Sequence, residues 1–208
     1  MNFLNVILDY IFPPTCTICN KFGQAYLCKE CEKELEKYLY NNKEKDVFHL
    51  FVYKEIIREK MIQFKFNDKS YMYHMFCEIF VKNKKACEFL KSYDIIIPVP
   101  IHKKRKHQRG YNQSELIARE LASKLGVTIY TDILKKTKNT KPQSLLDAKD
   151  RKKNTQGVYI VENSEKIKNK NVVILDDIYT TGATVNECKK MIKLAGAKNV
   201  GILTIAKD

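Results

Sequence analysis

The stretch VVILDDIYTTGAT, residues 172–184, decides the fold of this chain. Its first four residues are apolar, and such a run is typical of a strand buried in a parallel sheet. Two adjacent carboxylates, Asp176 and Asp177, follow, and then a loop of hydroxyl and glycine residues over 180–184. An amphipathic helical pattern comes next and ends at Gly196. The order is therefore strand, acidic tip, loop and helix.

The loop and the acids favour different ligand groups. A helix N-terminus carries free N–H groups and a partial positive charge, and threonine hydroxyls add donors, so residues 180–184 suit one phosphate. Asp176 and Asp177 would repel that phosphate and must face something else. Sugar hydroxyls or a divalent cation are the groups that suit a pair of carboxylates.

This arrangement resembles the phosphoribosyl pyrophosphate (PRPP) loop of type I phosphoribosyltransferases. In that family the two acids hold the ribose 2′ and 3′ hydroxyls, and the threonine–glycine loop holds the 5′-phosphate. The resemblance implies that Asp176 and Asp177 bind ribose and serve as the catalytic acids, favouring the positive charge that develops when pyrophosphate leaves. It also implies a phosphate-binding loop made of Thr180, Thr181, Gly182, Ala183 and Thr184. The competing interpretation is a buried strand that runs into an ordinary acidic turn.

Composition sets the broad class of the protein. The chain has 208 residues and a formal net charge of +14, so it can hold one α/β domain with a small appendage and favours polyanionic partners. No apolar run reaches membrane-spanning length, and Asp9 interrupts the apolar start over residues 1–12, which lacks the features of a signal peptide. We therefore expect a cytoplasmic protein.

Four of the seven cysteines form two C-x-x-C pairs, at Cys16, Cys19, Cys28 and Cys31. This spacing brings four thiolates within reach of one tetrahedral zinc ion and favours metal in a reducing compartment over disulfides. Four sulfur ligands leave no open position, so the predicted zinc is structural. The alternative is four unconnected buried thiols. We expect a zinc-binding module over residues 1–45, followed by the main domain over residues 46–208.

A basic segment follows the apolar strand predicted over residues 94–99. It contains Lys103, Lys104, Arg105 and Arg109, with no acidic residue before Glu115. A loop at the carboxyl end of a central strand is where an α/β sheet binds its ligand. In phosphoribosyltransferases the corresponding loop receives the pyrophosphate, so the resemblance implies that role here, together with Mg²⁺ bridging the pyrophosphate and ribose oxygens. The alternative is a solvated basic face.

The remaining pattern predicts an α/β fold, a parallel twisted sheet flanked by helices. A long polar stretch over residues 135–157 interrupts it and is read as a lid, a binding loop or a disordered segment. The predicted strands cover residues 48–53, 94–99, 127–131, 158–161, 172–176 and 200–205, and the predicted helices cover 2–12, 30–40, 56–66, 70–90, 116–125 and 185–195.

Three features together resemble the ComF (ComFC) family: the cysteine pairs, the PVPIH-x-x-R-x-x-x-RGYNQ segment starting at Pro98, and the TKPQSLLDA segment starting at Thr140. Members of that family are phosphoribosyltransferase-like proteins of bacterial DNA uptake. The resemblance implies PRPP binding and a role in handling internalised single-stranded DNA with competence-machinery proteins. In purine-salvage phosphoribosyltransferases an aspartate general base stands where this chain has Thr180, so no acceptor and no base are carried over.

Positive charge is concentrated in one quarter of the chain. Residues 103–153 hold fifteen Lys/Arg and five Asp/Glu, so ten of the fourteen net charges fall there. This exceeds what one phosphorylated ligand needs and predicts a nucleic-acid surface that includes Lys138, Lys141, Arg151 and Lys152, with Tyr111 as a stacking surface. Two other functions stay open: an active phosphoribosyltransferase of nucleotide metabolism or salvage, and a non-catalytic nucleic-acid or protein-binding module.

Overall fold

The computed structural model describes residues 15–23, 25–66, 69–140, 155 and 157–208. Two of the predictions, the N-terminal helix over residues 2–12 and most of the long polar stretch, lie outside these residues. The helices and strands are α2 (Lys29–Glu36), β1 (Val47–Val52), α3 (Glu55–Phe66), η1 (Ser70–Met72), α4 (Tyr73–Lys82), α5 (Lys84–Lys91), β2 (Ile95–Pro98), α6 (Lys103–Arg109), α7 (Gln113–Leu125), β3 (Thr128–Ile129), β4 (Leu134–Lys136), β5 (Tyr159–Val161), η3 (Ser164–Lys166), β6 (Asn171–Tyr179), α9 (Ala183–Leu194) and β7 (Asn199–Lys207).

The main sheet has five strands in the order β1-β7-β6-β2-β3, and every neighbouring pair is parallel. β6 lies at its centre, and β7 pairs with it from Asn171–Asn199 to Tyr179–Lys207. Because the strands are parallel, the segments that follow β1, β2 and β6 all leave the sheet at the same edge. The predicted parallel α/β fold is confirmed.

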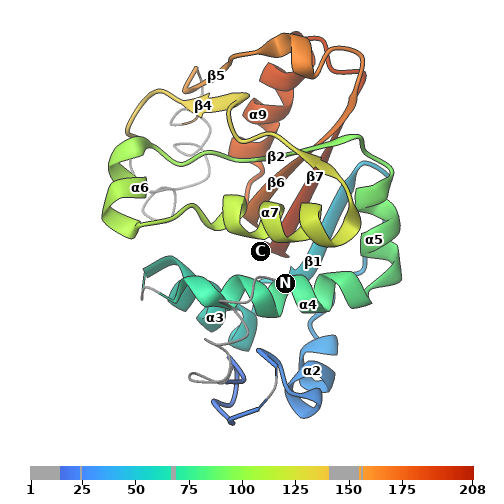
Figure 1. The fold of residues 1–208 in the computed structure, drawn as a ribbon, viewed down its shortest axis with the longest axis vertical. Helices are drawn as coiled ribbons and strands as arrows, with labels where there is room; N and C mark the ends of the chain where they lie inside the picture. The colour runs from blue at the N-terminus through green and yellow to red at the C-terminus, as the bar shows by residue number, and fades with distance from the viewer. Residues whose placement is uncertain (1–14, 24, 67–68, 141–154, 156) are drawn as a thin grey trace, which may run out of the picture.

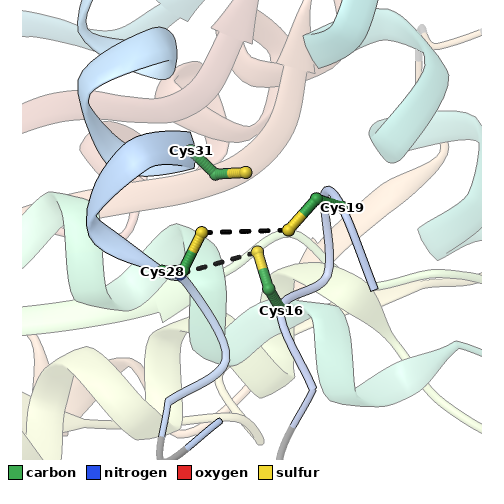
Figure 2. A group of neighbouring side chains, drawn as sticks. All are labelled: Cys16, Cys19, Cys28 and Cys31. Atoms are coloured by element: carbon green, nitrogen blue, oxygen red, sulfur yellow. Dashed lines mark hydrogen bonds between the residues drawn. The ribbon is translucent and has the colours of Figure 1, made fainter. Parts of the chain in front are cut away.

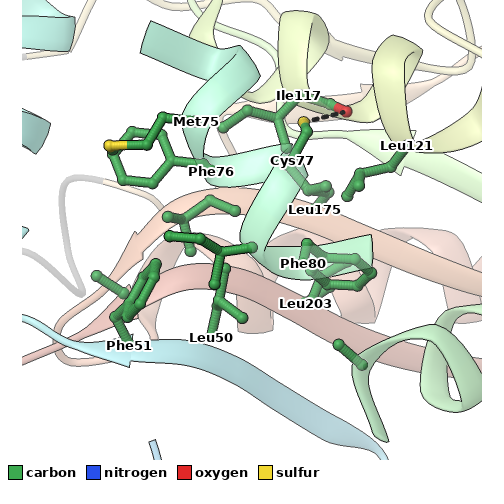
Figure 3. Close-up of a cluster of buried hydrophobic side chains, with 14 of the residues drawn as sticks. Leu50, Phe51, Met75, Phe76, Cys77, Phe80, Ile117, Leu121, Leu175 and Leu203 are labelled. Atoms are coloured by element: carbon green, nitrogen blue, oxygen red, sulfur yellow. Dashed lines mark hydrogen bonds between the residues drawn. The ribbon is translucent and has the colours of Figure 1, made fainter. Parts of the chain in front are cut away.

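Helices cover both faces of this sheet (Figure 1), and alternate residues of the strands supply the two cores. Leu175 and Leu203 join α4 and α7 in one core, where Phe76 and Phe80 are fully buried (Figure 3). Val172 and neighbouring residues of the opposite face pack against α9 in the other. The central strand is therefore buried on both sides, which explains its continuous apolar run.

Several boundaries differ from the sequence prediction. The helix predicted over residues 70–90 is broken at Asn83, whose side chain accepts a hydrogen bond from Ala86 N and starts α5. The polar stretch predicted from residue 135 begins later, because Leu134–Lys136 forms β4 and pairs antiparallel with β5 in a separate two-stranded sheet. β6 extends to Tyr179, so both acids lie within the strand.

Candidate functional site

The acid pair lies near the C-terminal end of the central strand, β6, at the carboxyl edge of the sheet. Asp176 Oδ1 accepts hydrogen bonds from Ser114 Oγ at 3.2 Å and from the backbone N of Asp177 at 2.9 Å. Burial, and then the charge of Asp177, raises the pKa of the Asp176 carboxyl to about 7, although Ser114 and Lys65 act in the opposite direction. Asp176 is therefore a carboxyl group held close to its titration point at neutral pH.

Asp177 has a cationic partner that the sequence did not identify. Lys65, in the last turn of α3, places Nζ 2.9 Å from Asp177 Oδ2, and the two side chains are only 22% and 15% exposed. Arg109 is a second cation near this carboxylate. Burial lowers the pKa of its guanidinium, and the charge of Asp177 opposes that change. The acid pair is thus partly neutralised by the protein itself.

The RGYNQ segment fastens α3 to the sheet edge. Phe64 O accepts hydrogen bonds from Tyr111 Oη at 2.5 Å and from Gln113 Nε2 at 3.2 Å. Arg109 donates to Gln113 Oε1 at 2.5 Å, and its guanidinium lies 5.4 Å from the ring centre of Phe66. These contacts hold the end of α3, and so Lys65, over the acid pair.

Tyr111 therefore has a role other than the one predicted, and its neighbour Asn112 joins two elements. The Tyr111 ring stacks on Phe64 at 5.9 Å and its hydroxyl is bonded to the backbone, so it is a packing residue and not an open stacking surface. Asn112 is the N-cap residue of α7, but its side chain makes no capping hydrogen bond. Its Nδ2 donates instead to Val99 O at 3.0 Å, which joins the start of α7 to the end of β2.

The predicted phosphate loop connects β6 to α9. Gly182 is the N-cap of α9 and has φ +73°, a conformation that favours glycine. A Cβ there would also meet the Tyr179 phenol and lie 2.8 Å from Asn186 Nδ2, so no larger residue fits without movement. A small pocket opens here, lined by Asp176, Ile178, Tyr179, Thr180, Gly182, Ala183, Thr184 and Val185. The structure therefore brings Asp176 and four of the five predicted loop residues around one pocket, whereas Thr181 and Asp177 are not among the residues that line it.

The basic segment after β2 is a helix, α6, and not the loop that the sequence predicted. His102 starts it by accepting a hydrogen bond from Lys104 N at 3.2 Å. Arg105 and Arg109 are half-buried, whereas Lys103 and Lys104 are exposed. Of the four predicted pyrophosphate ligands, Arg109 interacts electrostatically with Asp177, and Arg105 donates a hydrogen bond to Thr140 O at 3.4 Å.

A further lysine, Lys136 at the end of β4, interacts electrostatically with Asp176. Burial lowers the pKa of Lys136, the charge of Arg105 lowers it further, and Asp176 opposes both. The Lys136 Nζ lies 5.7 Å from the ring centre of Tyr159, whose phenol hydrogen-bonds with Thr184 of the phosphate loop. The hairpin therefore connects a cation and an aromatic side chain to the pocket.

The predicted nucleic-acid surface falls mostly outside the described residues. Lys141, Arg151 and Lys152 belong to the undescribed part of the polar stretch. Lys138 is described and exposed, just beyond β4. The structure therefore places only one of these four cations.

The four cysteines of the N-terminal module converge (Figure 2). Their Sγ atoms all lie within 4.8 Å of one another, and Cys19 Sγ and Cys28 Sγ are 3.8 Å apart. A zinc ion with bonds of about 2.3 Å to four tetrahedral sulfurs requires sulfur atoms about 3.8 Å apart, so these residues fit the ion. Burial acts to raise the pKa of Cys16, but backbone donors, including Cys28 N at 3.5 Å, lower it to about 6 and favour a thiolate.

The module packs directly on the main domain. Cys16, Leu27 and Leu35 are buried in the same core as α4 and α7. The Tyr26 ring stacks on His74 of α4 with ring centres 4.3 Å apart, which extends this contact. No described helix is long and apolar enough to cross a membrane.

Comparisons with known proteins agree with this architecture. Residues 112–208 match the phosphoribosyl transferase domain family, and residues 7–42 match the double zinc ribbon domain family. The chain is 27% identical to Competence protein F of Haemophilus influenzae, covering 92% of this chain and 90% of that protein. It is 25% identical to Competence protein ComFC of Streptococcus pneumoniae, covering 92% of this chain and 80% of that protein.

The chain belongs to the ComF family. Another relative is the DNA utilization protein YhgH of Escherichia coli, which is 31% identical over 55% of this chain and 49% of its own length. Among solved structures, a purine phosphoribosyltransferase from Pyrococcus horikoshii superposes with a TM-score of 0.42 at 20% identity, over 78% of this chain and 79% of that chain. For this ComF-family chain, the double zinc ribbon match and the thiol cluster support a structural zinc.

Proposed function

We propose that this ComF-family protein binds a phosphoribosyl ligand of the PRPP type and acts in DNA uptake or utilisation. The observation that carries the first part is the pocket that Asp176 shares with the Gly182 loop at the start of α9, with Asp177 as the next residue of the same strand. Carboxylates accept hydrogen bonds from the hydroxyls of a ribose, and a helix N-terminus donates N–H groups to a phosphate. Together they suit a ribose 5-phosphate. The second part rests on the names of the relatives.

The charges around the site indicate where the pyrophosphate part of the ligand would bind. The pyrophosphate would lie toward α6, which carries the half-buried Arg105 and Arg109 and the exposed Lys103 and Lys104. Mg²⁺ would supply further charge neutralisation on the pyrophosphate oxygens. If pyrophosphate leaves, Asp176 and Asp177 fix the ribose ring and favour the positive charge that develops on it. No acceptor substrate is assigned, and none of the described residues is assigned as a general base for one.

The proposal keeps the division into a zinc module over residues 1–45 and a main domain over residues 46–208, and a cytoplasmic location. The protein would take part in handling internalised DNA with competence-machinery proteins. The surplus of basic residues over 103–153 favours direct contact with a single strand. Exposed Lys103, Lys104 and Lys138 are the described cations that such a strand would meet.

Calorimetry with PRPP and Mg²⁺ tests the ligand. The double variant Asp176→Asn, Asp177→Asn should weaken binding by a few kcal/mol, as expected when charged hydrogen bonds are lost. Unchanged affinity would show that the acids do not hold ribose. Release of pyrophosphate with a panel of bases then separates an active transferase from a binding protein.

Fluorescence anisotropy with an unstructured single-stranded oligonucleotide at several salt concentrations tests the DNA contact. Changing Lys103, Lys104 and Lys138 together to Ala should weaken binding and reduce the salt dependence, because fewer counterions are displaced. If the wild type binds no single strand even at low salt, the connection to DNA is through protein partners alone.

A further inference from the structure

We propose that Lys65 is the resident cation of the acid pair, so that the site binds the ribose 5-phosphate part of its ligand without Mg²⁺. This inference rests on the proposed phosphoribosyl ligand and adds a binding residue to it. Lys65 belongs to α3 and lies outside the segment that matches the phosphoribosyl transferase domain, residues 112–208. Nothing in the acid and loop motif points to it.

The position of Lys65 is built into the fold. Its Nζ is 2.9 Å from Asp177 Oδ2, at the distance of a charge-assisted hydrogen bond, and both side chains are mostly buried. The preceding residue, Phe64, is fully buried, and its carbonyl accepts the two hydrogen bonds from Tyr111 and Gln113. The end of α3 is therefore fixed, and Lys65 does not depend on a mobile surface conformation to reach the carboxylate.

The charges around the acids explain why such a cation is needed. A phosphate at the Gly182 loop would share its pocket with Asp176, and Asp177 is the next residue of the strand. Repulsion between like charges is strong where water is partly excluded. Lys65 compensates Asp177, and Arg109 adds positive charge on the same side. A divalent cation brought to Asp177 would be repelled by the ammonium already bound there. The protein therefore supplies at the ribose end the neutralisation that Mg²⁺ supplies elsewhere.

This arrangement divides the ligand into two parts with different ion requirements. The ribose 5-phosphate part meets the acids, Lys65 and the loop that starts α9. The pyrophosphate part meets α6 and carries the larger charge, so any dependence on Mg²⁺ belongs to it. Ribose 5-phosphate, which lacks the pyrophosphate, is thus the probe that isolates the role of Lys65.

The experiment measures binding of ribose 5-phosphate and of PRPP by calorimetry, in excess EDTA and in millimolar Mg²⁺. The wild type should bind ribose 5-phosphate equally in both buffers. Lys65→Met should lose about 10- to 100-fold in affinity in EDTA, the range expected for a charged hydrogen bond, and recover part of it in Mg²⁺. Lys65→Arg should keep most of the wild-type affinity in EDTA because the charge is retained.

A matched control is Lys124→Met. Lys124 pairs with Glu120 at 3.2 Å on α7, away from the acids, so its loss removes the same charge from a similar pair. Circular dichroism and zinc content show whether each variant is folded. If Lys65→Met does not fold, Lys65→Gln is used in its place. The control should bind like the wild type in both buffers.

Three results would overturn this inference and leave the proposed function standing. The wild type could require Mg²⁺ to bind ribose 5-phosphate, or the Lys65→Met variant could bind it normally in EDTA. The third result is a Lys65→Met variant whose affinity is weakened equally in both buffers. The last would show a structural role only. If the wild type binds neither ribose 5-phosphate nor PRPP in either buffer, the proposed function fails and this inference fails with it.

Discussion

Replacing Asp176 by Asn should stabilise the protein, and the gain should grow with pH. Both hydrogen bonds to this side chain end on Oδ1, which an Asn retains, so the change removes a charge and keeps the donors satisfied. The pKa of Asp176 is raised from 3.8 to about 7, chiefly by burial. The folded protein therefore holds a proton that the unfolded chain releases, and ionising Asp176 costs folding free energy.

The size and sign follow from linkage. Between the unfolded pKa and the folded pKa, the free energy of unfolding of the wild type falls by about 1.4 kcal/mol per pH unit, and above about pH 7 it no longer changes on this account. The full cost of the charge is at most about 4 kcal/mol, since Asp176 keeps some contact with water. The advantage of Asp176→Asn over the wild type should thus be about 3 kcal/mol larger at about pH 8 than at about pH 5.

Urea unfolding followed by circular dichroism across this pH range measures the difference. The matched control is Asp132→Asn, because Asp132 accepts hydrogen bonds from Lys166 and Asn163 and its pKa is lowered. That variant should show no stabilisation at high pH. A difference between Asp176→Asn and the wild type that stays the same at every pH would refute the reasoning. The stabilised variant should also bind PRPP more weakly than the wild type, because a neutral amide oxygen accepts a hydrogen bond from a ribose hydroxyl less strongly than a carboxylate does.

Three other outcomes are expected. Zinc analysis should give about one ion per chain, lost in Cys28→Ser and retained in Cys87→Ser, whose thiol lies outside the four-cysteine cluster. Gly182→Ala should abolish calorimetric PRPP binding and destabilise the protein by about 1–3 kcal/mol, because its φ of +73° suits glycine and a Cβ would collide with its neighbours. Tyr111→Phe should cost about 1 kcal/mol in urea unfolding and speed hydrogen exchange in α3, because it removes the hydrogen bond to Phe64 O.

Local patterns in the sequence predicted the strand with its acids, the glycine turn and the cysteine pairs. Each of these is a short stretch whose chemistry depends on neighbours along the chain. Lys65 could not be found this way, because its role depends on contact between segments such as Phe64 and Tyr111, which are 47 positions apart. Neither the hydrophobic pattern of α3 nor its charges distinguish Lys65 from other surface lysines.

The errors have similar physical causes. The run of cations over residues 103–109 suggests a loop because charge dominates it, yet lysine and arginine are good helix formers and His102 starts the helix. Tyr111 was read as a stacking surface because aromatic rings near basic residues suit nucleic acid. Its hydroxyl and its ring are both used to hold α3, which only the packing of the helices reveals.

The parallel sheet explains why these separate segments form one site. The segments after β1, β2 and β6 leave the same edge, and they supply Lys65, Arg109 and the Gly182 loop respectively. A carboxyl such as Asp176 is costly to ionise there, because burial and its neighbour both oppose the charge. Lys65 offsets part of that cost from its position beside Asp177. If the Gly182 loop binds phosphate as proposed, the cation from α3 reduces the repulsion between that phosphate and the two adjacent carboxylates at this edge of the sheet.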